Sequence, residues 1–205
     1  MTEKFTVYLV DDDPGVLKAL SRLLRAKGHD VKPYSSPQVF LEEHDVAVPG
    51  CVVLDVSMPG LDGLEIQRVL TTASGYHRPV VFVTGKGDIP TSVRAMKAGA
   101  IDFLTKPVKD KDLFEAVSRA EARDAESRRL HSELESIQAK VSNLTPRERE
   151  VLTHVVAGRL NKQIAGDLGT VEKTIKVHRS RMMEKLGIRM VADLVRMAEK
   201  LNLSK

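Results

Sequence analysis

The sequence predicts a parallel α/β domain followed by an all-helical domain, with a long helix between them. Short apolar runs alternate with amphipathic helical segments over the first 120 residues. From residue 112 to 144 the chain has no Gly or Pro, and from 143 to 205 it shows helical periodicity alone. A length of 205 residues suffices for two domains. We therefore expect domains at 1–120 and 143–205 and a helical linker at 121–142.

Five apolar runs are the strand candidates of the first domain. The segments between them, such as PGVLKALSRLLRAKG, repeat apolar residues at helical spacing. Strands that alternate with helices form a parallel sheet with helices on both faces, and ligands bind at the carboxyl edge of such a sheet. The runs are FTVYLV (5–10), DVKPYS (30–35), CVVLD (51–55), VVFVT (80–84) and IDFLT (101–105).

Polar side chains end four of these strands. Strands one and three are neighbours in the flavodoxin-like strand order, and in that order Asp11 and Asp12 lie beside Asp55. Three close carboxylates repel one another unless a cation joins them, and their hard oxygen atoms suit Mg²⁺. The fourth and fifth strands bring Thr84 and Lys106 to the same edge. A hydroxyl, an ammonium and a metal ion around a carboxylate form a phosphoryl site.

The motifs LVDDD, VVLDVSMPGLDG, VTGKGD and AIDFLTKP resemble the receiver domain of two-component response regulators, and the TG-x-GD variant is similar to the FixJ group. The resemblance implies that Asp55 accepts a phosphoryl group from a histidine kinase. It also implies that the phosphoryl oxygens contact Thr84 and Lys106. Mg²⁺ or Mn²⁺ would be bound by Asp11 or Asp12, or both, together with Asp55 and the main-chain carbonyl of Ser57.

The same resemblance implies a switch and a cis peptide bond. Thr84 and Phe103 match the positions that respond to phosphorylation in the family, and Phe103 stands where a Tyr would add a phenolic hydrogen bond. The Lys106–Pro107 bond is expected to be cis. The loop GKGD (85–88) lacks the Gly-Lys-Ser/Thr of a nucleotide-binding loop, so we expect its glycines to permit movement instead.

Two alternatives stay open for this domain. The Asp11-x-Asp13 pair also resembles the nucleophile motif of haloacid-dehalogenase phosphatases, which would make Asp11 the phosphorylated residue. Pro14 and Gly15 follow that pair in place of the Thr or Val of those enzymes, so this enzyme reading is disfavoured. The other alternative is an orphan regulator that works without phosphorylation, against which the complete acidic site argues.

The linker carries a heptad pattern. Apolar residues at alternating spacings of three and four are typical of a coiled-coil seam, and we expect the linker to support a homodimer. A single helix packed against its own domains is the alternative. The linker seam consists of Ser127, Leu130, Leu134, Ile137, Val141 and Leu144.

The second domain is basic and contains a helix-turn-helix pattern. Residues 143–205 hold 13 Lys and Arg against 7 Asp and Glu, whereas 1–120 and 121–142 each have a net charge of −1. Such asymmetry suggests a polyanionic partner. The LTPREREVL segment predicts a capping box at Thr145 and Glu148, and a turn with Gly169 separates two helices, the second of which is basic.

The segments LTPREREVL, NKQIAGDL and TIKVHRSRMMEKL resemble the four-helix LuxR/NarL-type DNA-binding domain. The resemblance implies double-stranded promoter DNA and RNA polymerase as partners. It also implies base contacts from Lys176 and Val177, since lysine can donate to guanine edges and valine can pack on a thymine methyl. The same resemblance implies phosphate contacts from Lys173, Arg179 and Arg181. The predicted DNA-contacting residues are Lys173, Thr174, Lys176, Val177, Arg179, Ser180 and Arg181.

Val171 departs from the family pattern, which has Ser or Thr at this position to cap the second helix. Either Thr170 caps the helix one residue earlier or the cap is missing. The sequence has no apolar run of the ~20 residues that span a membrane and no signal-peptide pattern, so we expect a cytoplasmic protein. The single cysteine, Cys51, is expected to be a buried thiol without a redox role.

Overall fold

The computed structural model describes residues 4–72, 77–85 and 89–201. The chain divides into two compact units, Met1–Arg129 and Leu130–Lys205. The long helix predicted between the domains is α5 (Asp110–Ser142), and the division between the units falls within it. Residues of α5 up to Arg129 therefore belong to the N-terminal unit, and those from Leu130 belong to the C-terminal unit.

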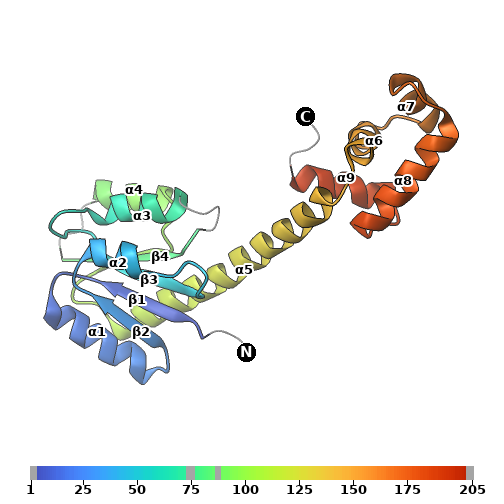
Figure 1. The fold of residues 1–205 in the computed structure, drawn as a ribbon. Helices are drawn as coiled ribbons and strands as arrows, with labels where there is room; N and C mark the ends of the chain where they lie inside the picture. The colour runs from blue at the N-terminus through green and yellow to red at the C-terminus, as the bar shows by residue number, and fades with distance from the viewer. Residues whose placement is uncertain (1–3, 73–76, 86–88, 202–205) are drawn as a thin grey trace. The chain divides into compact units, whose positions relative to one another are not determined.

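The N-terminal unit is built on a five-stranded parallel sheet with the order β2-β1-β3-β4-β5. Figure 1 labels the first four of these strands in chain order, β1 to β4. The order in the sheet confirms the expected neighbourhood of strands one and three, with Val10 of β1 opposite Leu54 of β3. The edge strand β2 tolerates Pro33 because a strand with one unpaired side can do without one amide donor. The strands are β1 (Thr6–Val10), β2 (Asp30–Tyr34), β3 (Gly50–Asp55), β4 (Val80–Thr84) and β5 (Asp102–Thr105).

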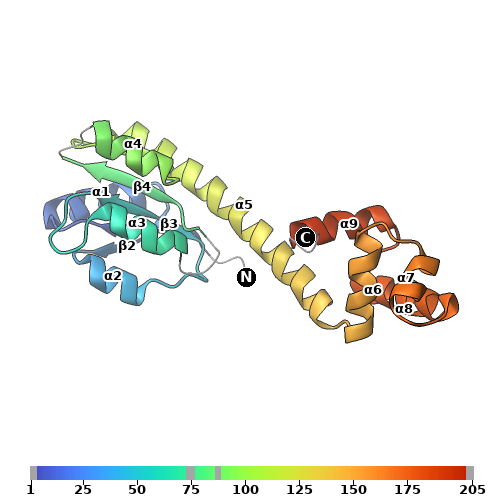
Figure 2. The same ribbon diagram turned by 90° about the horizontal axis from the view of Figure 1, so that it is seen from above.

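Two helical layers cover the sheet. Side chains alternate between its faces, so Val7 and Leu9 pack in one core cluster with α5, and Tyr8 and Val10 pack in the other. Cys51 is fully buried in the first cluster, and burial raises the pKa of its thiol, as expected for an inert structural thiol. Figures 1 and 2 show these helical layers around the sheet. Besides α5, the helices of this unit are α1 (Pro14–Ala26), α2 (Pro37–Glu43), α3 (Gly63–Thr72) and α4 (Ile89–Lys97).

Local signals account for where α1 begins and ends. Asp13 caps it by accepting hydrogen bonds from the amides of Gly15 and Val16, and Pro14 occupies the first turn, where no amide donor is needed. Beyond its last turn, Gly28 has a φ of 89°, a left-handed conformation that suits glycine. The helix therefore starts directly after the acidic end of β1, which fixes the loop that carries the carboxylates.

A cluster of charged groups fixes the middle of the long helix to the loop that precedes β3. Arg128 of α5 donates hydrogen bonds of 2.7 to 2.8 Å to the three carbonyl oxygens of residues 46–48 and one of 3.0 Å to Asp124, which is 2% exposed. From the other side, the buried Arg78 donates to carbonyls of the same loop and lies over the ring of Tyr8. We call Arg128, Asp124 and the 46–48 carbonyls the α5 anchor.

The C-terminal unit consists of the end of α5 and four shorter helices. Thr145 and Glu148 form the capping box predicted for α6. The residue at the N-cap of α8 is Val171, which makes no side-chain hydrogen bond, so the cap usual in the family is missing and has not moved to Thr170. The helices are α6 (Pro146–Val156), α7 (Asn161–Asp167), α8 (Glu172–Leu186) and α9 (Val191–Lys200).

The linker seam is divided between two environments. Leu144 belongs to the buried core of the C-terminal unit, and Ile137 and Val141 pack against that core. Leu130 remains 44% exposed and Leu134 is half-buried. The alternative expectation, a helix packed against its own domain, therefore describes the end of the linker, while the start of the seam is open.

Candidate functional site

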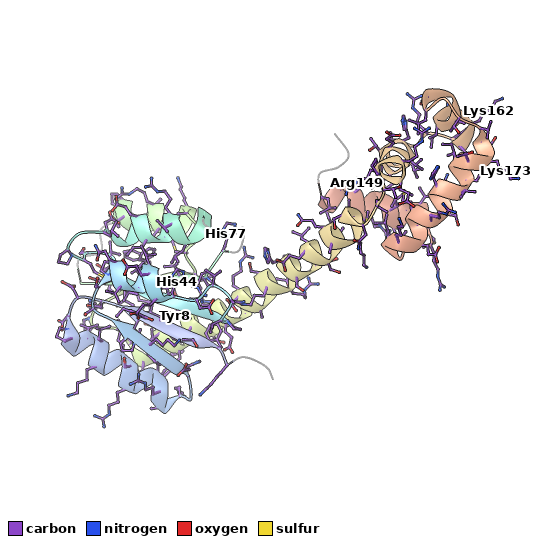
Figure 3. The ribbon with its side chains drawn as sticks, viewed as in Figure 1. Tyr8, His44, His77, Arg149, Lys162 and Lys173 are labelled. Atoms are coloured by element: carbon purple, nitrogen blue, oxygen red, sulfur yellow. The ribbon has the colours of Figure 1, made fainter. Side chains whose placement is uncertain are left out.

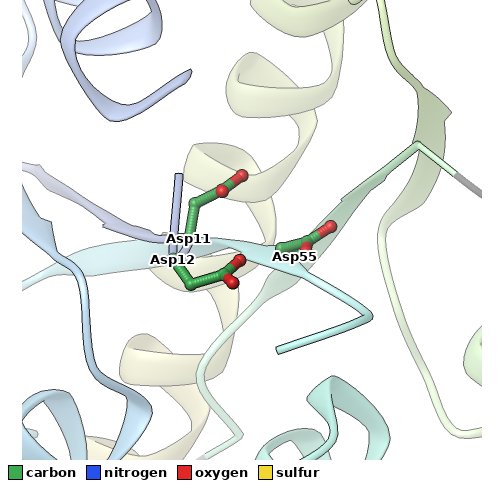
Figure 4. Close-up of side chains that lie close together, drawn as sticks. All are labelled: Asp11, Asp12 and Asp55. Atoms are coloured by element: carbon green, nitrogen blue, oxygen red, sulfur yellow. The ribbon is translucent and has the colours of Figure 1, made fainter. Parts of the chain in front are cut away.

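The carboxyl edge of the sheet brings three acidic side chains together, as predicted. Asp11 follows β1 and Asp55 ends β3, and the two strands are neighbours. Each of Asp11, Asp12 and Asp55 has an oxygen atom within 4.8 Å of those of the other two (Figure 4). Asp11 and Asp55 are 4% and 6% exposed, whereas Asp12 is exposed. The cluster thus has a buried side and a side open to solvent.

Lys106 joins this cluster from the fifth strand. Its ammonium lies 2.6 Å from Asp11 Oδ2 and 3.5 Å from Asp55 Oδ1. Its amide donates a 2.8 Å hydrogen bond to the carbonyl oxygen of Thr84, which fixes the loop after β5 to the end of β4. The Lys106–Pro107 peptide bond is cis, as expected from the family resemblance.

Burial and charge shift the pKa values of two of these groups. Burial raises the pKa of Asp55, the nearby Lys106 opposes that rise, and the charge of Asp11 adds to it. For Lys106, burial lowers the pKa, but the hydrogen bond to Asp11 and the charges of both carboxylates outweigh burial, so the pKa is raised. The lysine is therefore a permanent cation of the site.

The acidic cluster fits a hard divalent cation. Asp55 Oδ1 is buried and receives no hydrogen bond within the described part of the chain, and the Lys106 ammonium lies 3.5 Å from it. Asp11 Oδ1 accepts the amide of Asp13, which orients that carboxylate at the base of α1. Three carboxylates with an open side provide oxygen ligands and leave room for water, which is the coordination Mg²⁺ favours.

The remaining predicted receiver residues lie around this edge. Thr84 is fully buried at the end of β4, and Ser57 is exposed in the loop after β3. Phe103 is half-buried, with its ring centroid 6.0 Å from that of Phe82 in the core. The predicted loop movement concerns residues 85–88, of which 86–88 lie outside the described residues.

Gly63 supports the site and was not singled out from the sequence. A Cβ atom at this position would lie 2.6 Å from the main-chain oxygen of Asp55, so a side chain here would displace the end of β3. Its amide donates a 3.0 Å hydrogen bond to the carbonyl of Val56. The Asp62-Gly63 pair at the start of α3, where Asp62 caps the following amides, was the available signal.

The basic helix α8 exposes most of the residues predicted to contact DNA. Lys173, Lys176, Ser180 and Arg181 are exposed, and Val177 is 42% exposed. Lys176 pairs with Glu172 one turn earlier at 3.0 Å. Thr174 is half-buried.

Arg179 differs from its neighbours on α8. It is half-buried and donates a 2.9 Å hydrogen bond to Asn161 Oδ1, at the first residue of α7. Asn161 was not named from the sequence, because the contact joins residues 18 positions apart. Lysines lie close to both helix starts: Lys162 of α7 and Lys173 of α8 project outward in Figure 3.

Comparisons with known proteins agree with both units. Residues 7–118 match the family described as "Response regulator receiver domain", and residues 142–198 match "Bacterial regulatory proteins, luxR family". The chain is 41% identical to Nodulation protein W of Bradyrhizobium diazoefficiens, over 98% of this chain and 88% of that protein. It is also 41% identical to the transcriptional regulatory protein FixJ of Azorhizobium caulinodans, over 97% of this chain and 93% of that protein.

The chain is a two-component response regulator. It belongs to the FixJ group, with a receiver domain and a LuxR-type helix-turn-helix domain. The solved structure of the response regulator StyR resembles it over 96% of this chain and 99% of that chain, with 45% identity and a TM-score of 0.80. The response regulator is thus a phosphorylation-activated transcription factor that binds DNA, not an enzyme, and the phosphatase and orphan alternatives fall away.

The receiver implies a histidine kinase as one partner of the response regulator, and the helix-turn-helix domain implies DNA as the other. The acidic triad Asp11, Asp12 and Asp55 is typical of the Mg²⁺ site of receivers. In the part of the chain that the structure describes, no helix combines the length and the apolar character needed to cross a membrane.

Proposed function

We propose that Asp55 is the phosphoacceptor of this response regulator. One Asp55 carboxylate oxygen attacks the phosphorus of a phosphohistidine, a P–O bond forms, the P–N bond breaks, and the leaving imidazole takes up a proton. The observation that carries the proposal is the position of Asp55 at the end of a central strand, with Lys106 at 3.5 Å and two further carboxylates around it. Lys106 and the Thr84 hydroxyl are proposed to bind the phosphoryl oxygens.

We assign the metal ligands to Asp11, Asp12, Asp55 and the main-chain carbonyl of Ser57. A bound Mg²⁺ or Mn²⁺ would supply positive charge next to the developing acyl phosphate. The Lys106 ammonium lies 2.6 Å from Asp11, which orients this carboxylate, and 3.5 Å from Asp55, the proposed phosphoacceptor. The lysine therefore contacts both the proposed metal site and the proposed site of phosphorylation.

We propose that Thr84 and Phe103 transmit the change to α4 and β5 and that this surface supports a symmetric dimer. Three apolar residues of α4 are exposed: Ile89 at 79%, Val93 at 43% and Met96 at 46%. Exposed apolar side chains that recur on one helix face are suited to a protein partner. The buried ring of Phe82 contacts Phe103 and connects the core behind the site to β5.

For DNA, we propose that α8 enters the major groove. Lys176 donates to a guanine edge, Val177 packs on a thymine methyl, and phosphates contact Lys173 and Arg181. Thr174 and Ser180 stand at the rim of this surface. The hydrogen bond to Asn161 supports a different role for Arg179, that of positioning α7 against α8, in place of the phosphate contact predicted from the sequence.

A dimer with two such helices would bind a partly palindromic promoter site in the cytoplasm, where it would act on RNA polymerase. The test is labelling by a small phosphodonor with Mg²⁺, followed by binding to promoter fragments. Asp55→Asn should lose the label and the gain in DNA affinity, whereas Glu42→Gln, at an exposed acid of α2, should keep both. A label that persists in Asp55→Asn and moves to Asp11 would refute the assignment.

A further inference from the structure

Lys176 differs from the other exposed cations that are proposed to contact DNA, because a carboxylate is paired with it. Its ammonium lies 3.0 Å from Glu172 Oε1, one helical turn earlier on α8. Lys173 and Arg181 have no such partner among the residues that the structure describes. The side chains of Lys176 and Glu172 are 63% and 45% exposed, so both charges of the pair are accessible to a partner.

The stability of α8 gains little from this pair. An exposed ion pair one turn apart on a helix is screened by water and contributes weakly to folding. A carboxylate on a surface that meets DNA also repels phosphates, which lowers the affinity for DNA of any sequence. Glu172 is therefore better suited to discrimination between sequences than to affinity.

The pair lies at the part of the helix that reaches base edges. In a helix-turn-helix domain, the N-terminal residues of the second helix contact bases in the major groove. Glu172 is the first residue of α8, and Lys176 precedes Val177, for which a thymine methyl is proposed. Both charges of the pair thus enter the groove together when α8 is inserted as proposed.

The geometry of the pair matches the polar atoms of one C·G base pair. In the major groove, guanine presents the acceptors N7 and O6, and cytosine presents its N4 amino donor. The O6 and N4 atoms are joined by a base-pair hydrogen bond of about 2.9 Å, and the two charged groups on α8 lie 3.0 Å apart. An ammonium has three donors and a carboxylate has two oxygens, so each can keep its partner and still contact a base.

We propose that Glu172 determines sequence specificity: it accepts a hydrogen bond from cytosine N4 while Lys176 donates to the guanine of the same base pair. The inference rests on the proposed insertion of α8 and on the proposed guanine contact of Lys176. An A·T pair in the same orientation would set the adenine amino group against the ammonium and thymine O4 against the carboxylate. Both charges would then lose water without gaining a partner, which penalises the wrong sequence.

The first test compares the full chain with Glu172→Ala, both treated with a small phosphodonor and Mg²⁺. Bound sites are selected from a random-sequence DNA library, and the dissociation constant is measured for all four base pairs at each position. We expect Glu172→Ala to lose a preference of about tenfold at one C·G pair per half-site. Its affinity for unrelated DNA should rise by about two- to fivefold, because one repelling charge is gone.

The matched control is Glu184→Ala, which makes the same change at an exposed acid near the other end of α8. This variant should keep the preference for the C·G pair. A merely structural role for Glu172 would lower the affinity for all sequences together, and it would not raise the affinity for unrelated DNA.

The second test removes the amino group from the cytosine. A selected site is synthesised with 2-pyrimidinone in place of that cytosine, so that N4 is missing and the guanine is kept. The unaltered protein and Glu184→Ala should lose about tenfold in affinity for this site. Glu172→Ala should bind both sites equally, because the contact is already absent.

The outcomes separate the inference from the proposed function. If Lys176→Ala relaxes the preference at this base pair and Glu172→Ala does not, the role of Glu172 is refuted and the guanine contact of Lys176 stands. Equal losses of all three proteins on the 2-pyrimidinone site would refute it as well. If Lys176→Ala keeps every base preference, the proposed guanine contact fails, and the inference fails with it.

Discussion

The two units place their charges in opposite ways. The receiver buries Asp11, Asp55 and Asp124 beside cations, whereas α8 exposes Lys173, Lys176 and Arg181. Each arrangement suits the chemistry of its unit. A group that changes its covalent state needs a controlled charge and protonation, which burial and nearby ions provide. A surface that meets a polyanion needs accessible donors, and their charges lie in water until the partner arrives.

The sharpest test of the buried arrangement is Lys106→Ala. Without the ammonium, the phosphoryl oxygens lose a donor, and we expect phosphorylation by a small phosphodonor to slow about 10²-fold. Exposed Lys111→Ala serves as the control and should change the rate little. A rate within a factor of two of the unaltered protein would show that Lys106 is dispensable.

The pH profile extends this test. The pKa of Asp55 is raised by burial and lowered by Lys106, so its reactive carboxylate is lost as pH falls through a value above that of an ordinary aspartate. Removing the lysine removes the opposing effect, and the acid limb of the rate profile should move to higher pH in Lys106→Ala. An acid limb that does not move would mean that the ammonium acts on the phosphoryl group alone.

The α5 anchor tests whether the receiver depends on buried charge for stability as well. Arg128→Ala removes the donor to three carbonyls and the cation beside buried Asp124, and we expect the free energy of unfolding of the receiver to fall by about 2–3 kcal/mol. The neighbouring Arg129, 65% exposed and paired with Glu126, is the control, and Arg129→Ala should cost below about 0.5 kcal/mol. Thermal unfolding of the full chain followed by calorimetry measures both, and equal losses would contradict the anchor.

Glu148 departs from the pattern of exposed charges in the C-terminal unit. Among the described residues of this unit, it is the one charged residue that is buried. Lys185 lies 2.7 Å from it, and that hydrogen bond lowers its pKa. We expect Glu148→Gln to destabilise the unit by about 1 kcal/mol at neutral pH. Because the folded pKa is depressed, the stabilisation is present above the ordinary pKa of 4.5 and is lost as pH falls through the folded value. The measurement compares the free energy of unfolding of the unaltered protein and of Glu148→Gln as a function of pH. A difference that persists at low pH would mean that lost packing, and not the charge of Glu148, causes the destabilisation.

The smallest expected effect concerns the uncapped start of α8. Val171 is 65% exposed and makes no side-chain hydrogen bond at the N-cap. Val171→Ser should raise the free energy of unfolding of the C-terminal unit by about 0.5–1 kcal/mol, because the serine oxygen can accept an orphan amide of the first turn. Val171→Ala lacks that oxygen and should bring no such gain, which isolates the cap from the removal of an exposed valine.

The sheet and its acidic edge could be predicted because they depend on local pattern. Buried parallel strands read as apolar runs, and a strand that ends on Asp55 must present it at the carboxyl edge, beside Asp11 when strands one and three are neighbours. The capping box at Thr145 and Glu148 is equally local, since its two members lie three residues apart.

What could not be predicted depends on distances across the fold. Arg128 contacts carbonyls 80 to 82 positions away, and Lys106 lies closer to Asp11 than to Asp55, which no pattern specifies. The hydrogen bond from Arg179 to Asn161 joins two helices and is likewise not visible in the sequence. The linker seam shows that Ile137 and Val141 need a partner, but an apolar stripe does not say whether that partner is a second helix or the same chain.

The proline in the edge strand has a consequence for the protein in a crowded cell. An open sheet edge is a template for strand addition, and stacked receivers could then grow into fibrous aggregates. Pro33 lacks the amide that such pairing needs and lies within β2, between exposed Lys32 and half-buried Tyr34. The opposite edge strand, β5, is four residues long, and its Asp102 is held by Arg119. Both edges of the receiver sheet are thus protected against strand addition by a second copy of the chain.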